Sequence, residues 1–228
     1  MLNQIDYNSI QELLFHQLSN FWIDYDKKSI IRQIKRSVEE TVLSFEYSDD
    51  RRIIRDGILT FNPYYSTLWA IFLYRLSYNL SKAKQFHEAD LVYYLNKCMH
   101  SVDWFHSIVL PIHFGAEHPL GSVLGKANYG DFLFVYQGTT IGGNRKNGLL
   151  SYPTLGSRVV LFSNSSVLGN AIIGNNVVIS ANTHIINQIV PDNCIVFGIS
   201  PNIVIKEKTE EEIQIITKSY WCDNQEQY

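Results

Sequence analysis

The sequence is short of the residues that cross-link a chain or anchor it in a membrane. Its three cysteines, Cys98, Cys194 and Cys222, are odd in number and widely spaced, which fits a reducing compartment. This usage excludes a disulfide framework and a cysteine-based zinc site. The longest apolar stretch, residues 68–76, is far too short to span a bilayer. The N-terminal stretch carries acidic residues and no continuous apolar segment, so we expect no signal peptide.

A strong charge of either sign is also missing. The net charge is −3, and no run of lysine and arginine suggests a surface for nucleic acid or for a membrane. We therefore expect a cytoplasmic protein that binds neither. Hydrophobic residues, in contrast, make up 46% of the chain, with 14 tyrosines and 12 phenylalanines. That content is ample for the core of one large domain or two small ones.

A period of six residues runs from Leu155 to Ile189. Written in sixes, the sequence reads LGSRVV, LFSNSS, VLGNAI, IGNNVV, ISANTH and IINQIV. The first position is always a large aliphatic residue, namely Leu155, Leu161, Val167, Ile173, Ile179 and Ile185. The fifth is small or β-branched, namely Val159, Ser165, Ala171, Val177, Thr183 and Ile189. Glycine and asparagine fill much of the rest.

This period is typical of a parallel β-helix, in which each short strand forms one flat side of a three-sided coil. The aliphatic residue of each row fills the interior, and the small residue fits near a corner. Glycine and asparagine tolerate the positive φ angles that tight corners need. Ordinary strands would instead alternate every two residues, and no hairpin dipeptide separates the rows. We therefore predict a β-helix.

The N-terminal half has no six-residue period and reads as helices. We expect helices over Ser9–Trp22, after an N-cap at Asp26, from Asn62-Pro63 onwards, and over roughly Glu88 to His100. A helical module of this kind would cover the open end of the β-helix and serve in assembly. We predict an α+β chain with a helical domain over 1–102, a β-helix over 103–206 with an extruded loop at 144–153, and a tail over 207–228.

The densest cluster of reactive side chains lies at the junction of the two halves. It holds Asp103, His106, His113, Glu117 and His118. Three histidines so close in sequence raise the alternative of a metal site, as in carbonic-anhydrase-like β-helices. The spacings of that class do not match this sequence, so we expect no metal.

Several motifs then follow in a defined order. They are Asp103, Glu117-His118-Pro119-Leu120-Gly121, Thr140-Ile141-Gly142-Gly143, a loop ending in Tyr152-Pro153, the hexapeptides, and Gly198-Ile199-Ser200-Pro201-Asn202-Ile203-Val204. Over about residues 60–206 the chain in this respect resembles serine O-acetyltransferase. Hexapeptides alone mark only a superfamily, whereas the ordered set with its Asp-to-His spacing is more specific.

The resemblance implies a left-handed β-helix, a homotrimer, and acetyl-CoA as the donor in a cleft between subunits. By match of motif, His118 is the general base that deprotonates an acceptor hydroxyl, and Asp103 holds its imidazole in the right tautomer. If one coil has three hexapeptide sides, residues fifteen apart lie on adjacent coils, so these two side chains can meet. Imidazole suits the role because its pKa lies near working pH.

Other positions match the contacts of the two substrates. For the donor these are Gly142, Gly143 (a candidate for the thioester oxygen) and Ala181, while Lys206 would neutralise a CoA phosphate. Each glycine could equally be required by a tight corner. Glu117 takes the family's acidic acceptor-binding position, where aspartate is usual.

The acceptor loop departs from the family. It ends in Ser151-Tyr152-Pro153 where the family has Arg-His-Pro, and serine cannot replace a bidentate guanidinium. Arg145 or Lys146 would have to substitute from another direction. Tyr152, Arg145 and Asp56 therefore join Glu117 as candidate acceptor contacts. The C-terminus reads DNQEQY instead of ending in isoleucine, so we do not expect cysteine synthase as a partner.

We therefore expect an acetyl-CoA-dependent O-acetyltransferase whose small-molecule acceptor is a sugar or a polysaccharide precursor. Two alternatives stay open: an authentic serine O-acetyltransferase of cysteine biosynthesis, and a catalytically silent β-helix that serves in assembly. A nucleotidyltransferase with a β-helical tail is disfavoured, because no glycine-rich strand–loop–helix unit precedes the repeats. Whether trimers pair through the helical half is also open.

Overall fold

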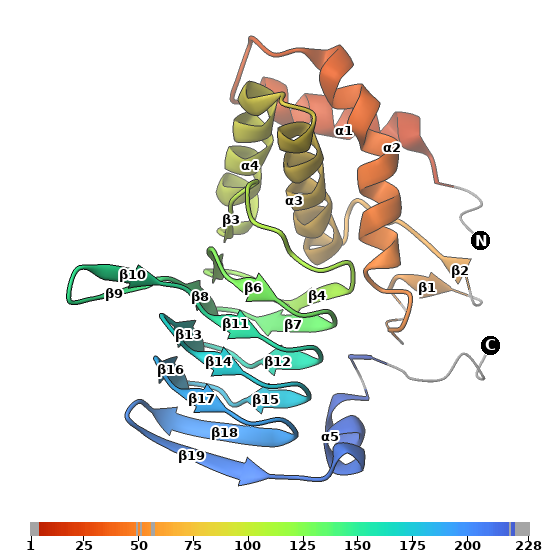
Figure 1. The fold of residues 1–228 in the computed structure, drawn as a ribbon. Helices are drawn as coiled ribbons and strands as arrows, with labels where there is room; N and C mark the ends of the chain where they lie inside the picture. Colours follow the sequence, from red (N-terminus) through yellow and green to blue (C-terminus); the bar gives the residue numbers. More distant parts are fainter. Residues whose placement is uncertain (1–4, 49, 51, 56–57, 219, 222–228) are drawn as a thin grey trace.

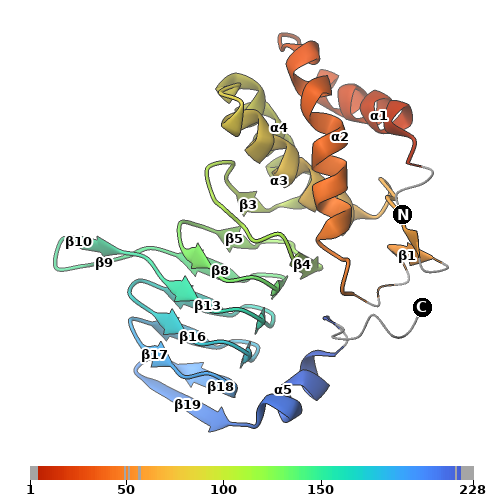
Figure 2. The ribbon, with the colours of Figure 1, turned by 45° about the vertical axis from the view of Figure 1, so that its right-hand side comes forward.

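The computed structural model describes residues 5–48, 50, 52–55, 58–218, 220 and 221, and it consists of a helical half and a β-helix (Figure 1). The helical half contains α1 (Tyr7–Ser19), α2 (Lys27–Leu43), the hairpin β1 (Ile54–Arg55) and β2 (Ile58–Leu59), α3 (Ser66–Lys82) and α4 (Phe86–His100). Figures 1 and 2 show the four helices gathered at one end of the β-helix. In the described part of the chain, no helix is both long and apolar enough to cross a membrane.

Side-chain caps explain where these helices begin. The Asp26 carboxylate accepts a hydrogen bond from the Lys28 amide, which confirms the predicted N-cap of α2. Asp6 caps α1 in the same way, so this helix begins before the predicted Ser9. The predicted start of α3 at Asn62-Pro63 was wrong: the Asn62 side chain accepts from the Tyr64 amide and forms a local turn, and the helix begins only at Ser66.

The β-helix has three sides on which strands of successive coils pair in parallel, and it is left-handed. The first side carries β3 (Asp103–Trp104), β5 (Val123–Leu124), β8 (Thr140–Gly142), β13 (Ser166–Leu168) and β16 (His184–Ile186). The second carries β6 (Asn128–Tyr129), β11 (Thr154–Leu155), β14 (Ile172–Ile173) and β17 (Ile189–Val190). The third carries β4 (Phe114–Glu117), β7 (Leu133–Tyr136), β12 (Val159–Leu161), β15 (Val177–Ile179) and β18 (Cys194–Ile199).

Two features depart from this regular coil. The hairpin of β9 (Asn144–Lys146) and β10 (Leu149–Ser151) projects from the prism, as predicted for the extruded loop (Figure 1). At the far end β19 (Asn202–Glu207) pairs antiparallel with β18. The helix α5 (Glu210–Thr217) follows within the predicted tail, and it begins with a capping box between Thr209 and Glu212.

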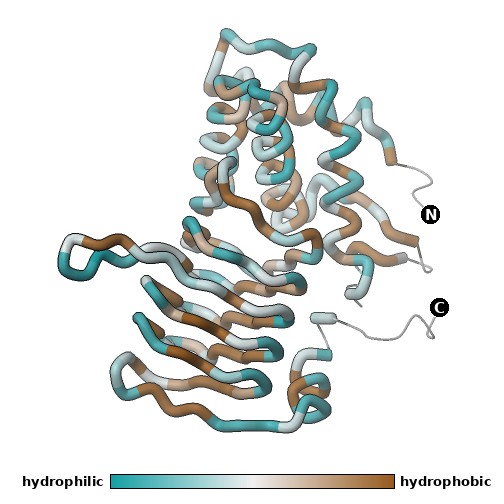
Figure 3. Tube along the Cα trace, in the orientation of Figure 1, coloured by the Kyte–Doolittle hydropathy of each residue, from teal (hydrophilic) through white to brown (hydrophobic). Residues whose placement is uncertain are grey.

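The six-residue period fills the interior of the prism as predicted. All six first-position residues are at most 2% exposed. In Figure 3 the tube is brown along much of the flat sides of the coils and teal at several of their corners. The fifth-position rule fails at Ile189, whose exposure is 71%. Paired residues differ in number by 18 between Leu155 and Ile173 but by 17 between Ile173 and Val190. Because the last coil is one residue shorter, Val190 points inward in place of its neighbour.

The helical half closes the open end of the prism. Tyr74 of α3 is 1% exposed, and its hydroxyl donates to the Ile108 carbonyl (2.7 Å) and accepts from the Leu110 amide (2.9 Å). Its ring packs edge-on against Trp104 of the first coil. One apolar core therefore continues from α3 into the β-helix. This continuity fits the expected role of the helical half as a cap.

The corners of the coil give a direct test of the backbone argument. Asn182 is exposed and has φ of 59°, so alanine in its place must adopt a left-handed conformation. We expect Asn182→Ala to lower the free energy of unfolding by about 1–2 kcal/mol, and Asn182→Gly to leave it nearly unchanged. Urea titration of both variants measures this. Equal losses in the two would contradict the backbone explanation.

Candidate active site

His118 stands at a strained and exposed corner directly after β4. Its φ is 48°. At this corner the residue in register with Gly138, Asn164 and Asn182 of the following coils is Gly121, so His118 lies in a stretch two residues longer than the corners that follow. A positive φ is uncommon for residues other than glycine. The His118 side chain is 73% exposed. Strain of this kind clusters at functional positions, and here it aims a titratable ring outward.

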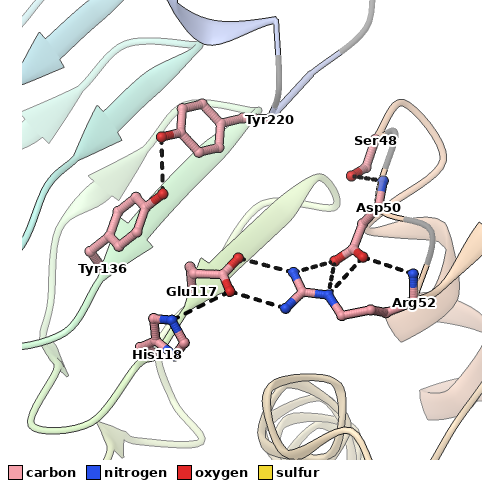
Figure 4. Close-up of polar contacts among 7 residues, drawn as sticks. All are labelled: Ser48, Asp50, Arg52, Glu117, His118, Tyr136 and Tyr220. Carbon is pink, nitrogen blue, oxygen red and sulfur yellow. Dashed lines mark hydrogen bonds and ion pairs between the residues drawn. The ribbon is translucent and has the colours of Figure 1, made fainter.

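The carboxylate beside this ring belongs to Glu117, the last residue of β4. Its Oε1 lies 3.7 Å from His118 Nε2. Both of its oxygens also accept from Arg52, with Nη1–Oε1 at 3.1 Å and Nη2–Oε2 at 3.0 Å (Figure 4). Arg52 lies in the segment between α2 and β1. A bidentate guanidinium from the helical half therefore holds the predicted acceptor carboxylate.

Arg52 is itself held on two further sides. Its Nε donates to Asp50 Oδ1 and its Nη2 to Asp50 Oδ2, both at 2.8 Å. Its guanidinium carbon also lies 4.6 Å from the centre of the Tyr65 ring. Hydrogen bonds first to Asp50 and then to Glu117 raise the pKa of Arg52, so it stays charged. These ion pairs use four of its five N–H groups.

A pocket of about 250 Å³ opens over this ion-pair network. Its lining consists of Phe45, Ser48, Asp50, Arg52, Ala116, Glu117, Phe134, Tyr136 and Tyr220. Figure 4 shows Tyr136 and Tyr220 facing each other across from the Glu117–Arg52 pair, with His118 on the other side of Glu117. The pocket thus combines two carboxylates, one guanidinium and a wall of aromatic rings, and its size suits one small molecule.

Asp103, the predicted partner of the base, is engaged elsewhere. Its Oδ1 accepts from the Tyr93 hydroxyl at 2.7 Å and its Oδ2 from Lys97 Nζ at 2.6 Å. Burial alone would raise the pKa of Asp103, but the hydrogen bonds from Lys97 and Tyr93 outweigh it and the net pKa is lowered. In the described structure no hydrogen bond or ion pair joins Asp103 to His118. In register Asp103 pairs with Val123, because the first coil is longer than the hexapeptide rule assumes.

The other two histidines of the junction lie apart from His118. His106 Nε2 is 2.9 Å from Asp90 Oδ1, and His113 Nδ1 is 2.7 Å from Asp131 Oδ2. Within the residues that the structure describes, no group of three or more His, Cys, Asp or Glu side chains is placed to hold a metal ion.

The predicted acceptor contacts of the extruded loop are not near Glu117 in the same chain. Arg145 lies on β9, and its Nη1 donates to the Gly148 carbonyl at 3.0 Å. The Tyr152 ring lies under Lys126 Nζ at 4.6 Å. In Figures 1 and 2 the hairpin projects from the side of the prism opposite to β1 and β2. Asp56 falls outside the described residues.

The predicted donor contacts are also spread over one chain. Gly142 ends β8, whereas Ala181 precedes β16, so they lie at opposite ends of the first side. Lys206 lies on β19, with its Nζ 5.1 Å from the centre of the Phe197 ring. A Cβ on Gly143 would meet the Leu150 and Tyr152 side chains at 3.0 Å, so a larger residue there would require these side chains to shift by a few tenths of an ångström.

Sequence reasoning missed Arg52, Tyr136 and Tyr220 as site residues. Arg52 and Tyr220 come from segments 65 residues before and 103 residues after Glu117, and neither lies in a periodic pattern. Tyr136 had a signal: it follows the inward Val135 at a coil corner, and it is the register partner of Glu117.

Comparisons with known proteins agree with this architecture. No protein-family model matches the chain. The serine acetyltransferase of Staphylococcus epidermidis is 28% identical over 138 residues, which cover 60% of this chain and 63% of that protein. The chain thus matches less than two thirds of the length of this curated relative.

Solved structures show the same fold. The Neisseria gonorrhoeae serine acetyltransferase has a TM-score of 0.67 at 23% identity, covering 88% of this chain and 82% of that one. A serine acetyltransferase in complex with CoA has a TM-score of 0.67 at 18% identity, covering 90% and 86%. In sequence the chain thus resembles serine acetyltransferases over part of its length, and its fold is the hexapeptide-repeat, left-handed β-helix that those structures have.

Proposed function

We propose that the protein is an acetyl-CoA-dependent O-acetyltransferase of small hydroxylated molecules. The observation that carries this proposal is the exposed His118 imidazole, fixed at a strained corner beside Glu117 and next to the pocket. The likeness to serine acetyltransferases, one of which was solved with CoA, supports the choice of donor.

In this mechanism His118 takes the proton of the acceptor hydroxyl as its oxygen attacks the thioester carbonyl. The C–S bond then breaks and the acetyl group stays on the acceptor oxygen as an ester. The His118 imidazolium returns the proton to the sulfur, so CoA leaves as the thiol. The base needs a ring nitrogen free of strong partners, and the exposure of His118 provides one. The role of Asp103 in orienting this imidazole stays a prediction. Asp103 would have to give up its ion pair with Lys97 to contact His118.

The charge of the pocket supports an acceptor other than an amino acid. An ammonium group would bind Asp50 and Glu117, but Arg52 already donates to both carboxylates. A guanidinium at that place repels a second cation and leaves little carboxylate capacity free. Neutral hydroxyl groups meet no such penalty, and aromatic walls suit the apolar face of a sugar ring. We therefore propose a sugar or a similar polyol as the acceptor.

The donor and the loop contacts are proposed to act between subunits of a homotrimer. Gly142, Ala181 and Lys206 come from three different coils or strands of one chain, and a groove between two prisms would place a neighbouring subunit beside them. The projecting hairpin would carry Arg145 and Tyr152 towards a neighbouring acceptor site. The spread of these residues from β8 to β19 along the prism supports a site of this kind.

Thiol release from acetyl-CoA tests the proposal. The acceptor panel would contain L-serine, L-homoserine, D-glucose, D-galactose, N-acetyl-D-glucosamine and glycerol, each with a matched reaction lacking protein. We expect thiol release to be faster with a sugar or polyol than with L-serine. A clear preference for L-serine would instead identify an authentic serine acetyltransferase. No release with any acceptor, together with no CoA binding by calorimetry, would indicate a silent scaffold.

A further inference from the structure

The last described residues of the chain return to the candidate active site. After β19 the helix α5 runs beside the prism in Figures 1 and 2, and it is followed by Tyr220 and Trp221. Both side chains join an outward-facing aromatic cluster on the third side of the β-helix. The segment therefore does not leave the fold at β19 as a solvated tail.

Trp221 is the anchor of this return. It is 3% exposed, and its ring packs edge-on against Phe132 (centroids 5.4 Å apart) and Phe134 (6.0 Å). Its ring also lies over Gly115 of β4, where a Cβ would come within 3.4 Å of it. Among the described residues the buried indole nitrogen has no hydrogen-bond partner, so the anchoring comes from ring packing.

Tyr220 is the residue that this anchor places in the pocket. Its ring packs on Phe134 at 4.5 Å, and its hydroxyl is hydrogen-bonded to the Tyr136 hydroxyl at 3.0 Å (Figure 4). Tyr136 is held by stacking on Phe162 and pairs in register with Glu117. The two hydroxyls therefore stand over the carboxylate that lies beside His118.

The tyrosine pair offers neutral hydrogen-bonding groups to a ligand. One O–H is used within the pair, which leaves the other O–H and several lone pairs for the pocket. Burial, and then the hydrogen bond with Tyr220, raises the pKa of Tyr136, so this hydroxyl stays protonated. A ligand that gives and takes hydrogen bonds and carries an apolar face fits this arrangement.

We infer that the segment at Tyr220 and Trp221 forms one wall of the acceptor pocket and that Tyr220 determines acceptor specificity by hydrogen-bonding a hydroxyl of a polyol. This inference rests on the proposed acetyltransferase function of the same site. It assigns acceptor recognition to three sets of residues, namely Phe45, Ser48, Asp50 and Arg52 before β1, the strands β4 and β7, and Tyr220.

Steady-state kinetics with the best acceptor of the panel test the role of Tyr220. Tyr220→Phe keeps the ring packing and removes one hydroxyl, so the acceptor KM should rise about three- to tenfold, the net worth of one hydrogen bond. The KM for acetyl-CoA should stay within about twofold of the wild-type value. A purely structural role of Tyr220 would instead change both KM values. Tyr64→Phe, at an exposed tyrosine outside the pocket, is the matched control. An unchanged acceptor KM, or a change in the KM for acetyl-CoA instead, would overturn the inference.

A second variant tests whether the segment forms a wall of the pocket, independently of the Tyr220 hydroxyl. Trp221→Ala removes the anchor, so we expect a larger rise in acceptor KM and faster trypsin cleavage after Lys218 than in the wild type. Cleavage at the wild-type rate with an unchanged acceptor KM would show that the segment forms no wall.

If the wild type releases no thiol with any acceptor, the proposed function fails and calorimetry decides the inference separately. In that case binding of a panel sugar that Tyr220→Phe weakens would support the pocket assignment. No binding of any panel compound to the wild type would refute it.

Discussion

Replacing His118 is expected to lower the rate of acetyl transfer by about 10²–10⁴-fold, which is the usual contribution of a general base. No other imidazole lies beside Glu117 in the described structure, since His106 and His113 are bonded to other carboxylates. Thiol release from acetyl-CoA at saturating acceptor measures the effect.

Two variants separate the chemistry from the strain of the corner. His118→Ala forces alanine into a positive φ, whereas His118→Asn places a residue type that tolerates it, as Asn164 and Asn182 do in later coils. Both should be inactive, with circular dichroism like that of the wild type. His16→Ala, at an exposed histidine of α1, is the matched control and should keep full activity. Full activity in His118→Asn would contradict the assignment of the base.

The second large effect is expected at Arg75 of α3, which is 5% exposed and meets no carboxylate among the described residues. Its guanidinium donates to the carbonyls of Leu110 (3.5 Å), Pro111 and Ile112 (3.0 Å). Burial lowers the pKa of Arg75, which is the cost of a buried charge. These carbonyls lie in the segment that leads into β4, so this side chain ties the helical half to the strand that ends beside His118.

Arg75→Met should lower the free energy of unfolding by about 3 kcal/mol or more, because it leaves buried carbonyls without donors. Urea unfolding measures this loss. Lys82→Met, at the exposed end of the same helix, is the control and should change the value by less than about 0.5 kcal/mol. A loss below about 1 kcal/mol for Arg75→Met would show that water or a rearranged backbone satisfies these carbonyls.

The parts of the structure that could be predicted from the sequence are those set by local periodicity. The six-residue period specifies which residue of each row points inward, and the first residues of all six rows, from Leu155 to Ile185, are buried as predicted. The shorter last coil was not predicted, because two aliphatic residues, Ile189 and Val190, stand next to each other and either could point inward. The helix α5 was missed although its capping signal, Thr209 followed by Glu212, stands in the sequence.

The site was less predictable because its contacts are non-local. Motif order singled out Glu117 and His118 as candidates, but no local rule says that Arg52 reaches Glu117 across 65 positions. The expected meeting of Asp103 and His118 assumed regular coils, whereas the first coil is longer and Lys97 engages Asp103. Pairing partners of charged side chains depend on the packing of whole segments.

The central claim is that this chain moves an acetyl group from acetyl-CoA to a hydroxyl with His118 as the base. Transfer of radiolabelled acetyl from acetyl-CoA to the acceptor panel, with the products separated by chromatography, tests it most directly. We predict a labelled ester on a sugar or polyol with the wild type and none above background with His118→Asn. Equal labelling by both proteins, or no labelled ester with any acceptor, would contradict the claim.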